Sequence, residues 1–238
     1  MAQRGPGGAT GLLTSALRYA LSVSALVKPT ELASPTPCAQ WDIRALLRHL
    51  GESVADLEAG LRTGSLDDAG QADPAPARPP RLAGHDEVDL FSPAGVLRER
   101  AAALLCACYD GGPAERFVVV GGLPLPAGIV ACTGAVEITV HGWDVSAALG
   151  RGGSIPPALA TRLLALCPLL ATSREGLFAP AVPVSPEASP GDRLLGYLGR
   201  DPGAPPWARP EAYRPGQGGQ AGTGTGQPGN WSRRLAAP

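Results

Sequence analysis

An apolar stripe at helical spacing is the feature that most restricts how this chain can fold. Between residues 42 and 61, large apolar side chains recur every three or four positions. This spacing places them on one face of an α-helix, and that face must be buried against other elements. Asp42, directly before the stripe, is the predicted N-cap. The stripe consists of Ile43, Leu46, Leu47, Leu50, Val54, Leu57 and Leu61.

The same periodicity recurs along the chain and predicts five further helices. The segment from Thr63 to Asp86 is instead rich in Gly, Pro and Asp, which predicts a long loop. Residues 117–120 can form a short extended piece, and the Leu-Pro-Leu-Pro run at 123–126 is expected to be a loop. The further helices are predicted over residues 10–27, 92–109, 127–149, 156–170 and 192–198.

Periodic burial covers most, but not all, of the 238 residues. Residues 1–9 form a Gly-rich leader, which we expect to be flexible. Residues 203–238 are rich in Gly, Pro and Gln with little to bury, a composition that predicts disorder. The predicted folded unit is therefore residues 10–202, an all-α antiparallel four-helix bundle with a short C-terminal helical extension.

Charge and hydropathy argue against several classes of function. The formal net charge of −1 gives no electrostatic reason to expect nucleic acid or an anionic membrane as partner. No uninterrupted apolar run reaches the roughly 18–20 residues that span a bilayer, and the N-terminus lacks the pattern of a secretory signal. We therefore expect a cytoplasmic protein, as a monomer or a homodimer.

The cysteines and tryptophans carry weaker signals. Five cysteines, an odd number scattered through helical stretches, do not describe a disulfide framework. Reduced, buried thiols in a cytosolic protein are the simpler interpretation. Cys106 and Cys108 lie on different faces of their predicted helix and make a weak zinc half-site. Trp41 and Trp143 are predicted to be packing residues.

Glu137 and His141 stand four residues apart in the helix predicted at 127–149. At this spacing two side chains share one helical face, with Cβ atoms about 5–6 Å apart. His49, on the flank of the apolar stripe, can reach the same place if the two helices pack together. Two imidazole nitrogens and one carboxylate oxygen suit Zn²⁺, with Fe²⁺, Ni²⁺ and Mn²⁺ as alternatives. Three protein ligands also leave a coordination position for water or substrate.

The spacing alone leaves simpler interpretations open. Glu137 and His141 can be an ordinary surface pair worth a few tenths of a kcal/mol, and His49 can be a solvated flank residue. Asp144, one turn further on, can support a ligating imidazole or be an exposed carboxylate. His85 lies in the predicted loop, where a solvated side chain is the simpler interpretation.

Two longer motifs resemble a known family. Residues 35–50, Pro-Thr-Pro-Cys-Ala-Gln-Trp-Asp-Ile-Arg-Ala-Leu-Leu-Arg-His-Leu, resemble the first signature of the mycothiol-dependent maleylpyruvate isomerase N-terminal superfamily, within the wider DinB-like fold. Residues 137–144, Glu-Ile-Thr-Val-His-Gly-Trp-Asp, resemble its second signature. The stretch at 155–202 is similar to one actinobacterial subgroup of metal-binding proteins, so the resemblance covers about residues 10–202.

The resemblance implies a four-helix bundle that binds a divalent metal through His49, Glu137 and His141. It also implies that the metal activates a low-molecular-weight thiol, mycothiol in the isomerase, which adds to a double bond, permits rotation and leaves. A separate C-terminal domain completes that isomerase, whereas this chain has a short helical extension and a tail.

Two functional hypotheses follow. We expect a metal-dependent thiol S-transferase or isomerase-like enzyme that acts on a small electrophile, with Asp144 orienting His141. The competing hypothesis is a non-catalytic regulatory module, similar to zinc-binding anti-sigma factors. In that case the metal would staple the helices together and the tail would meet a protein partner.

Overall fold

We describe a computed structural model of the protein. The structure describes residues 8–38, 41–67, 92–110, 116–151, 153–170 and 180–203. Nearly all of the predicted leader and tail, and the loop that carries His85, lie outside the described residues. The predictions made for those segments therefore stay predictions.

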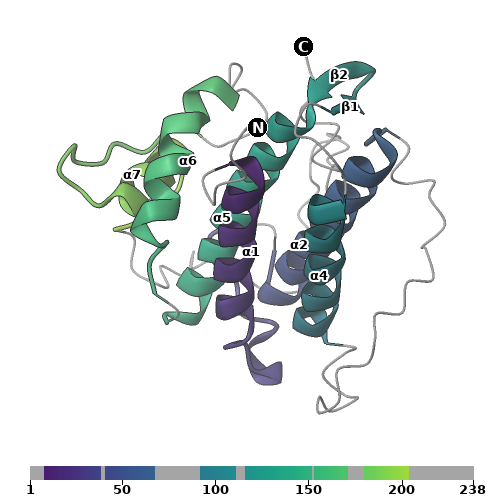
Figure 1. Ribbon diagram of the computed structural model, residues 1–238. Helices are drawn as coiled ribbons and strands as arrows, with labels where there is room; N and C mark the ends of the chain where they lie inside the picture. Colours follow the sequence, from purple (N-terminus) through teal and green to yellow (C-terminus); the bar gives the residue numbers. More distant parts are fainter. Residues whose placement is uncertain are drawn as a thin grey trace, which may run out of the picture.

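Four helices pack side by side into a bundle (Figure 1). The first packs mainly against the last, the two middle helices pack against each other, and the second also contacts the last. The four therefore enclose a common core, and the predicted all-α bundle is confirmed. The helices are α1 (Ala9–Ser24), α2 (Ile43–Thr63), α4 (Pro93–Asp110) and α5 (Ala127–Leu149).

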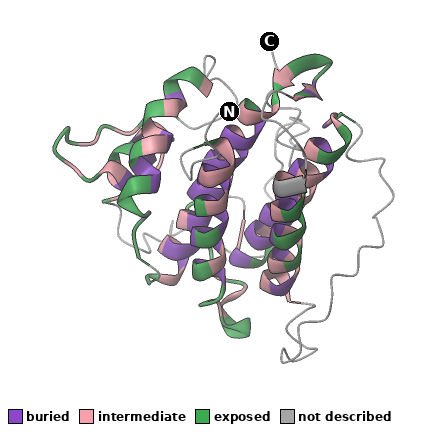
Figure 2. Cartoon of the chain, in the orientation of Figure 1, coloured by how far each residue is buried: buried purple, intermediate pink, exposed green. Residues whose placement is uncertain are grey.

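The second helix, α2, shows why the sequence folds this way. The carboxylate of Asp42 accepts a hydrogen bond from the amide of Ala45 at 2.8 Å, which confirms the predicted N-cap. Gly64 ends the helix in a left-handed conformation with φ of 83°. Figure 2 shows the buried residues along the inward faces of the bundle. On α2 the fully buried members of the predicted stripe are Ile43, Leu46, Leu47, Leu50, Val54 and Leu57.

Residues 117–126 form a β-hairpin, so the expected loop at 123–126 is wrong. Strand β1 (Phe117–Val120) pairs antiparallel with strand β2 (Leu123–Pro126). In this register the last residue of β1 pairs with the first residue of β2, which leaves a two-residue turn between the strands.

The turn residues explain why the hairpin forms. Gly121 and Gly122 have positive φ angles of 58° and 78°, the backbone that tight two-residue hairpin turns require. Both amides donate to the carboxylate of Asp67, at 2.7 and 2.8 Å. The Gly-Gly pair was the sequence signal for this hairpin. The second strand ends at Pro126 and leads directly into α5.

The C-terminal extension consists of α6 (Pro157–Leu170) and α7 (Pro190–Tyr197). The two helices pack on each other, and α6 also packs on α5 (Figure 1). At Gly196 a Cβ atom would collide with Val184 and with the carbonyl of Val182, so glycine permits this close approach. This approach packs the segment that precedes α7 against that helix. None of the described helices is long and apolar enough to cross a bilayer.

Candidate metal centre

The three predicted ligands meet between α2 and α5. His49 Nε2 lies 3.2 Å from Glu137 Oε1, and His141 Nε2 lies 3.1 Å from the same oxygen. The candidate ligand atoms of the three side chains all lie within 4.8 Å of one another. The structure thus brings together a mixed nitrogen and oxygen donor set of the kind that Zn²⁺ accepts.

Two glycines of α5 let the neighbouring helices approach this group. A Cβ atom at Gly134 would lie 2.5 Å from Leu57 Cδ2 on α2. A Cβ atom at Gly142 would lie 3.3 Å from Ala20 on α1. Gly134 therefore permits a close approach of α2, which carries His49, and Gly142 permits a close approach of α1.

Asp144 supports His141 from the side opposite Glu137. His141 Nδ1 lies 3.0 Å from Asp144 Oδ2, and the Asp144 side chain is fully buried. An anionic acceptor at Nδ1 keeps a proton on that nitrogen, so Nε2, which faces Glu137, is the nitrogen that can exchange its proton for a metal ion. The interpretation of Asp144 as an exposed carboxylate is therefore wrong.

Arg200 was not predicted from the sequence. Its Nε donates to Asp144 Oδ1 at 3.0 Å, and one terminal nitrogen donates to Asp144 Oδ2 at 2.9 Å. The two residues are 56 positions apart in the chain. The resemblance expected for residues 155–202 included Arg200 but gave it no role.

Trp41, predicted only to pack, lies directly beside the centre. Its ring centroid is 4.4 Å from that of His49 and 5.8 Å from that of His141. The two imidazoles meet edge to face, with centroids 5.2 Å apart. The indole therefore restricts the ring orientation of both histidines. The sequence did not indicate this role, because it shows only that Trp41 precedes the N-cap of α2.

The charges in this centre stabilise one another. Burial by itself would raise the pKa of Glu137, but attraction to His141 and hydrogen bonds with both imidazoles lower that pKa well below its usual value. Burial would lower the pKa of His141, but the carboxylates of Glu137 and Asp144 raise it to about 9. Burial likewise acts to raise the pKa of Asp144, yet hydrogen bonds with His141 and Arg200 lower it. The centre therefore holds alternating charges, and a metal ion would take the place of the proton shared at Nε2.

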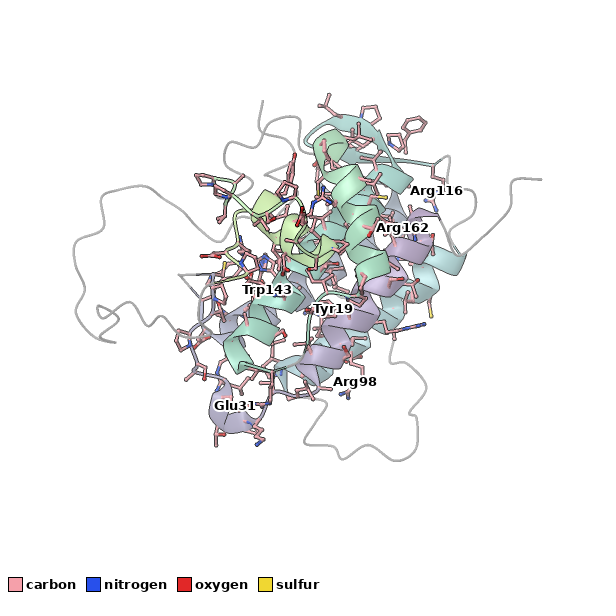
Figure 3. All side chains as sticks on the ribbon, turned by 90° about the vertical axis from the view of Figure 1, so that its left-hand side faces the viewer. Tyr19, Glu31, Arg98, Arg116, Trp143 and Arg162 are labelled. Carbon is pink, nitrogen blue, oxygen red and sulfur yellow. The ribbon has the colours of Figure 1, made fainter. Side chains whose placement is uncertain are left out.

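The centre is partly open to solvent. The side chains of His49 and Glu137 are 12% and 22% exposed, whereas that of His141 is 7% exposed. A cleft of about 500 Å³ lies nearby, where Arg200 joins Trp143 and Ser146 in its wall. Figure 3 views the molecule from the side of the C-terminal extension and labels Trp143, one of the residues in the wall of the cleft. A small molecule thus has space beside the residues that support the candidate ligands.

Comparison with known proteins assigns the family. The family model of the mycothiol maleylpyruvate isomerase N-terminal domain matches residues 13–146, more than half of the chain. The chain belongs to this family. His49, Glu137, His141 and Asp144 all lie within the matched residues, whereas Arg200 lies beyond them.

Two relatives are uncharacterized proteins of Mycobacterium tuberculosis, one from strain CDC 1551 / Oshkosh and one from strain ATCC 25618 / H37Rv. Each is 27% identical to this chain over 182 residues, which cover 73% of this chain and 87% of the relative. No solved structure matches the chain.

Proposed function

We propose that this family member is a metal-dependent enzyme that activates a low-molecular-weight thiol, mycothiol, and transfers it to a small electrophile. The observation that carries the proposal is the convergence of two imidazole nitrogens on one oxygen of Glu137, at 3.1 and 3.2 Å. His49, Glu137 and His141 would hold Zn²⁺, or alternatively iron, nickel or manganese. Membership of the mycothiol isomerase family supports the choice of thiol.

Each residue around the centre has a definite task in this proposal. A bound divalent ion would supply Lewis acidity, which lowers the pKa of a thiol or water that it holds. Asp144 keeps the proton of His141 on Nδ1, and Arg200 keeps the buried carboxylate of Asp144 charged and in place. Trp41 covers the imidazoles and keeps bulk water from them. The cleft beside Arg200 offers space for the organic part of a substrate.

The metal is tested by elemental analysis of the purified wild-type protein beside His49→Ala and Glu137→Ala. The proposal predicts about one metal ion per wild-type chain and a sharp loss in both variants. Glu52→Ala is the matched control, because Glu52 lies on α2 with a side chain that is 59% exposed and pairs with Arg48 at the surface. Equal metal content in all four proteins would remove the proposed site.

The activity is tested with metal-loaded protein, a low-molecular-weight thiol and a panel of electrophiles. The proposal predicts thiol consumption that depends on the metal and is lost in Glu137→Ala. A rate no higher than that of the thiol alone, across the whole panel, would refute the enzymatic function while leaving the metal site intact.

A non-catalytic metal module is the second candidate, and one observation favours it. The candidate ligands come from two different helices, α2 and α5, so a bound ion would also link these helices and stabilise the bundle. This hypothesis predicts that chelation lowers the melting temperature strongly and that a protein partner co-purifies. Chelation that abolishes thiol transfer but leaves folding intact would decide for the enzyme.

A further inference from the structure

Cys38 lies beside the metal centre, on the side of His141 that faces Asp144. The Cys38 sulfur, a ring nitrogen of His141 and a carboxylate oxygen of Asp144 all lie within 4.8 Å of one another. The ring nitrogen that faces Asp144 is Nδ1, at 3.0 Å from Oδ2. This second group of ligand atoms is therefore on the opposite side of the imidazole from Glu137.

The backbone holds Cys38 firmly in this position. Its amide donates to the hydroxyl oxygen of Thr36 at 3.2 Å, and its carbonyl accepts from the amide of Trp41 at 2.8 Å. The amide of Thr36 in turn donates to the carbonyl of Trp41 at 3.2 Å. The backbone of Cys38 is thus fixed by hydrogen bonds of its amide and its carbonyl, and the side chain is half-buried.

The surroundings of Cys38 already stabilise positive charge. The fully buried carboxylate of Asp144 accepts from the guanidinium of Arg200 and faces the imidazole of His141. Each carboxylate oxygen has two lone pairs, so Oδ1 can accept from Arg200 and still bind a cation. Sulfur, nitrogen and oxygen donors together suit borderline or soft ions such as Zn²⁺, Co²⁺ and Cd²⁺.

We propose that Cys38, His141 and Asp144 form a second cation site, which contains a thiolate and shares His141 with the first. Binding there releases the thiol proton of Cys38 and the Nδ1 proton of His141 to solvent. It removes the hydrogen bond by which Asp144 orients His141, and it places a second positive charge against the same ring. The second ion therefore binds more weakly than the first, and excess metal disturbs the first site.

Co²⁺ is the probe that distinguishes the two sites, because thiolate coordination adds a charge-transfer band in the near ultraviolet. In wild-type protein the first equivalent of Co²⁺ should bind without this band, and the second should produce it. In His49→Ala, which keeps all three ligands of the second site, Co²⁺ added in excess should bind with the band, and more weakly than the first ion binds to the wild type. If the thiolate band forms but no ion binds to His49, Glu137 and His141, the second site is supported while the proposed function is not.

Two cysteine variants separate the proposed ligand from a thiol that merely happens to be present. Cys38→Ser should abolish the band and lower the affinity for the second ion at least about tenfold, with the affinity for the first changed less than about twofold. Cys106→Ser is the matched control, because Cys106 is exposed on α4 and should leave the band unchanged. A band that survives Cys38→Ser, or the absence of any band in wild type and His49→Ala, would overturn the proposal.

A measurement on the wild-type chain covers the case in which Cys38→Ser fails to fold. Alkylation by iodoacetamide, followed by mass spectrometry, reports the reactivity of each thiol. The second equivalent of Zn²⁺ should slow alkylation of Cys38 at least about tenfold and leave Cys106 unaffected, because a metal ion withdraws electron density from the sulfur and shields it from the reagent. Equal rates at Cys38 with one and with two equivalents would overturn the second site.

Discussion

Arg200 holds the buried carboxylate of Asp144 with two of its guanidinium nitrogens, at 3.0 and 2.9 Å. Asp144 in turn faces Nδ1 of His141 at 3.0 Å. Arg200 lies outside the residues that match the family domain, which end at position 146. The C-terminal extension therefore completes the candidate metal centre of the bundle, and this link can be tested directly.

Replacing Arg200 by Ala should weaken both the fold and metal binding. The variant leaves the buried Asp144 carboxylate facing His141 without the guanidinium, and breaking a buried pair typically costs about 3–5 kcal/mol. Loss of a hydrogen-bond partner behind a metal-ligating histidine typically lowers metal affinity about 10–100-fold. Chemical denaturation and zinc titration measure the two effects. Arg193→Ala, an exposed arginine on α7, is the matched control and should change neither. Unchanged zinc affinity in Arg200→Ala would show that the extension does not support the centre.

Metal binding should strengthen as the pH rises from 6 to 9. In the metal-free protein His141 is stabilised as a cation, with a pKa of about 9 against a usual value of 6.5. Its contribution to folding is complete below pH 6.5 and is lost as the pH rises through about 9. A metal must displace a proton from this imidazole, so proton competition weakens binding at low pH. Zinc titrations across this range check the slope, and affinity that is independent of pH would contradict it.

The same reasoning gives the acid side of the stability profile. The pKa values of Glu137 and Asp144 are both lowered in the folded protein, so their contributions are present above their unfolded pKa values and lost as the pH falls. The metal-free protein should therefore lose stability both in acid and toward pH 9, whereas the zinc-loaded protein should keep its stability toward pH 9. Melting temperatures of the two forms against pH provide the test.

The meeting of the three candidate ligands was predictable from the sequence because each lies inside a strongly periodic helix. On a helix the spacing of Glu137 and His141 already fixes their common face, and the apolar stripe of α2 fixes the flank on which His49 lies. The position of Arg200 depends instead on how α7 packs, and no local pattern encodes that. The hairpin at 117–126 was missed because the Leu-Pro-Leu-Pro run that follows the glycine turn was interpreted as a loop rather than as a strand.

Gly134→Ala should separate the helices that carry the ligands. The added Cβ atom would lie 2.5 Å from Leu57 Cδ2, so α2 must shift or Leu57 must change its rotamer. Overpacking of this kind typically costs about 1–3 kcal/mol. Because Gly134 lies one turn before Glu137, a shift of α2 moves His49 away from its partner, and zinc affinity should fall together with stability. Gly128→Ala is the matched control on the same helix, since its Cβ atom would meet Ala9 at an ordinary 3.8 Å. The control should be neutral or stabilise the helix by about 0.5–1 kcal/mol, with zinc affinity unchanged.

A Gly134→Ala variant that loses stability but keeps its zinc affinity would contradict the prediction. It would show that the distance between α2 and α5 does not determine how tightly the candidate centre binds zinc.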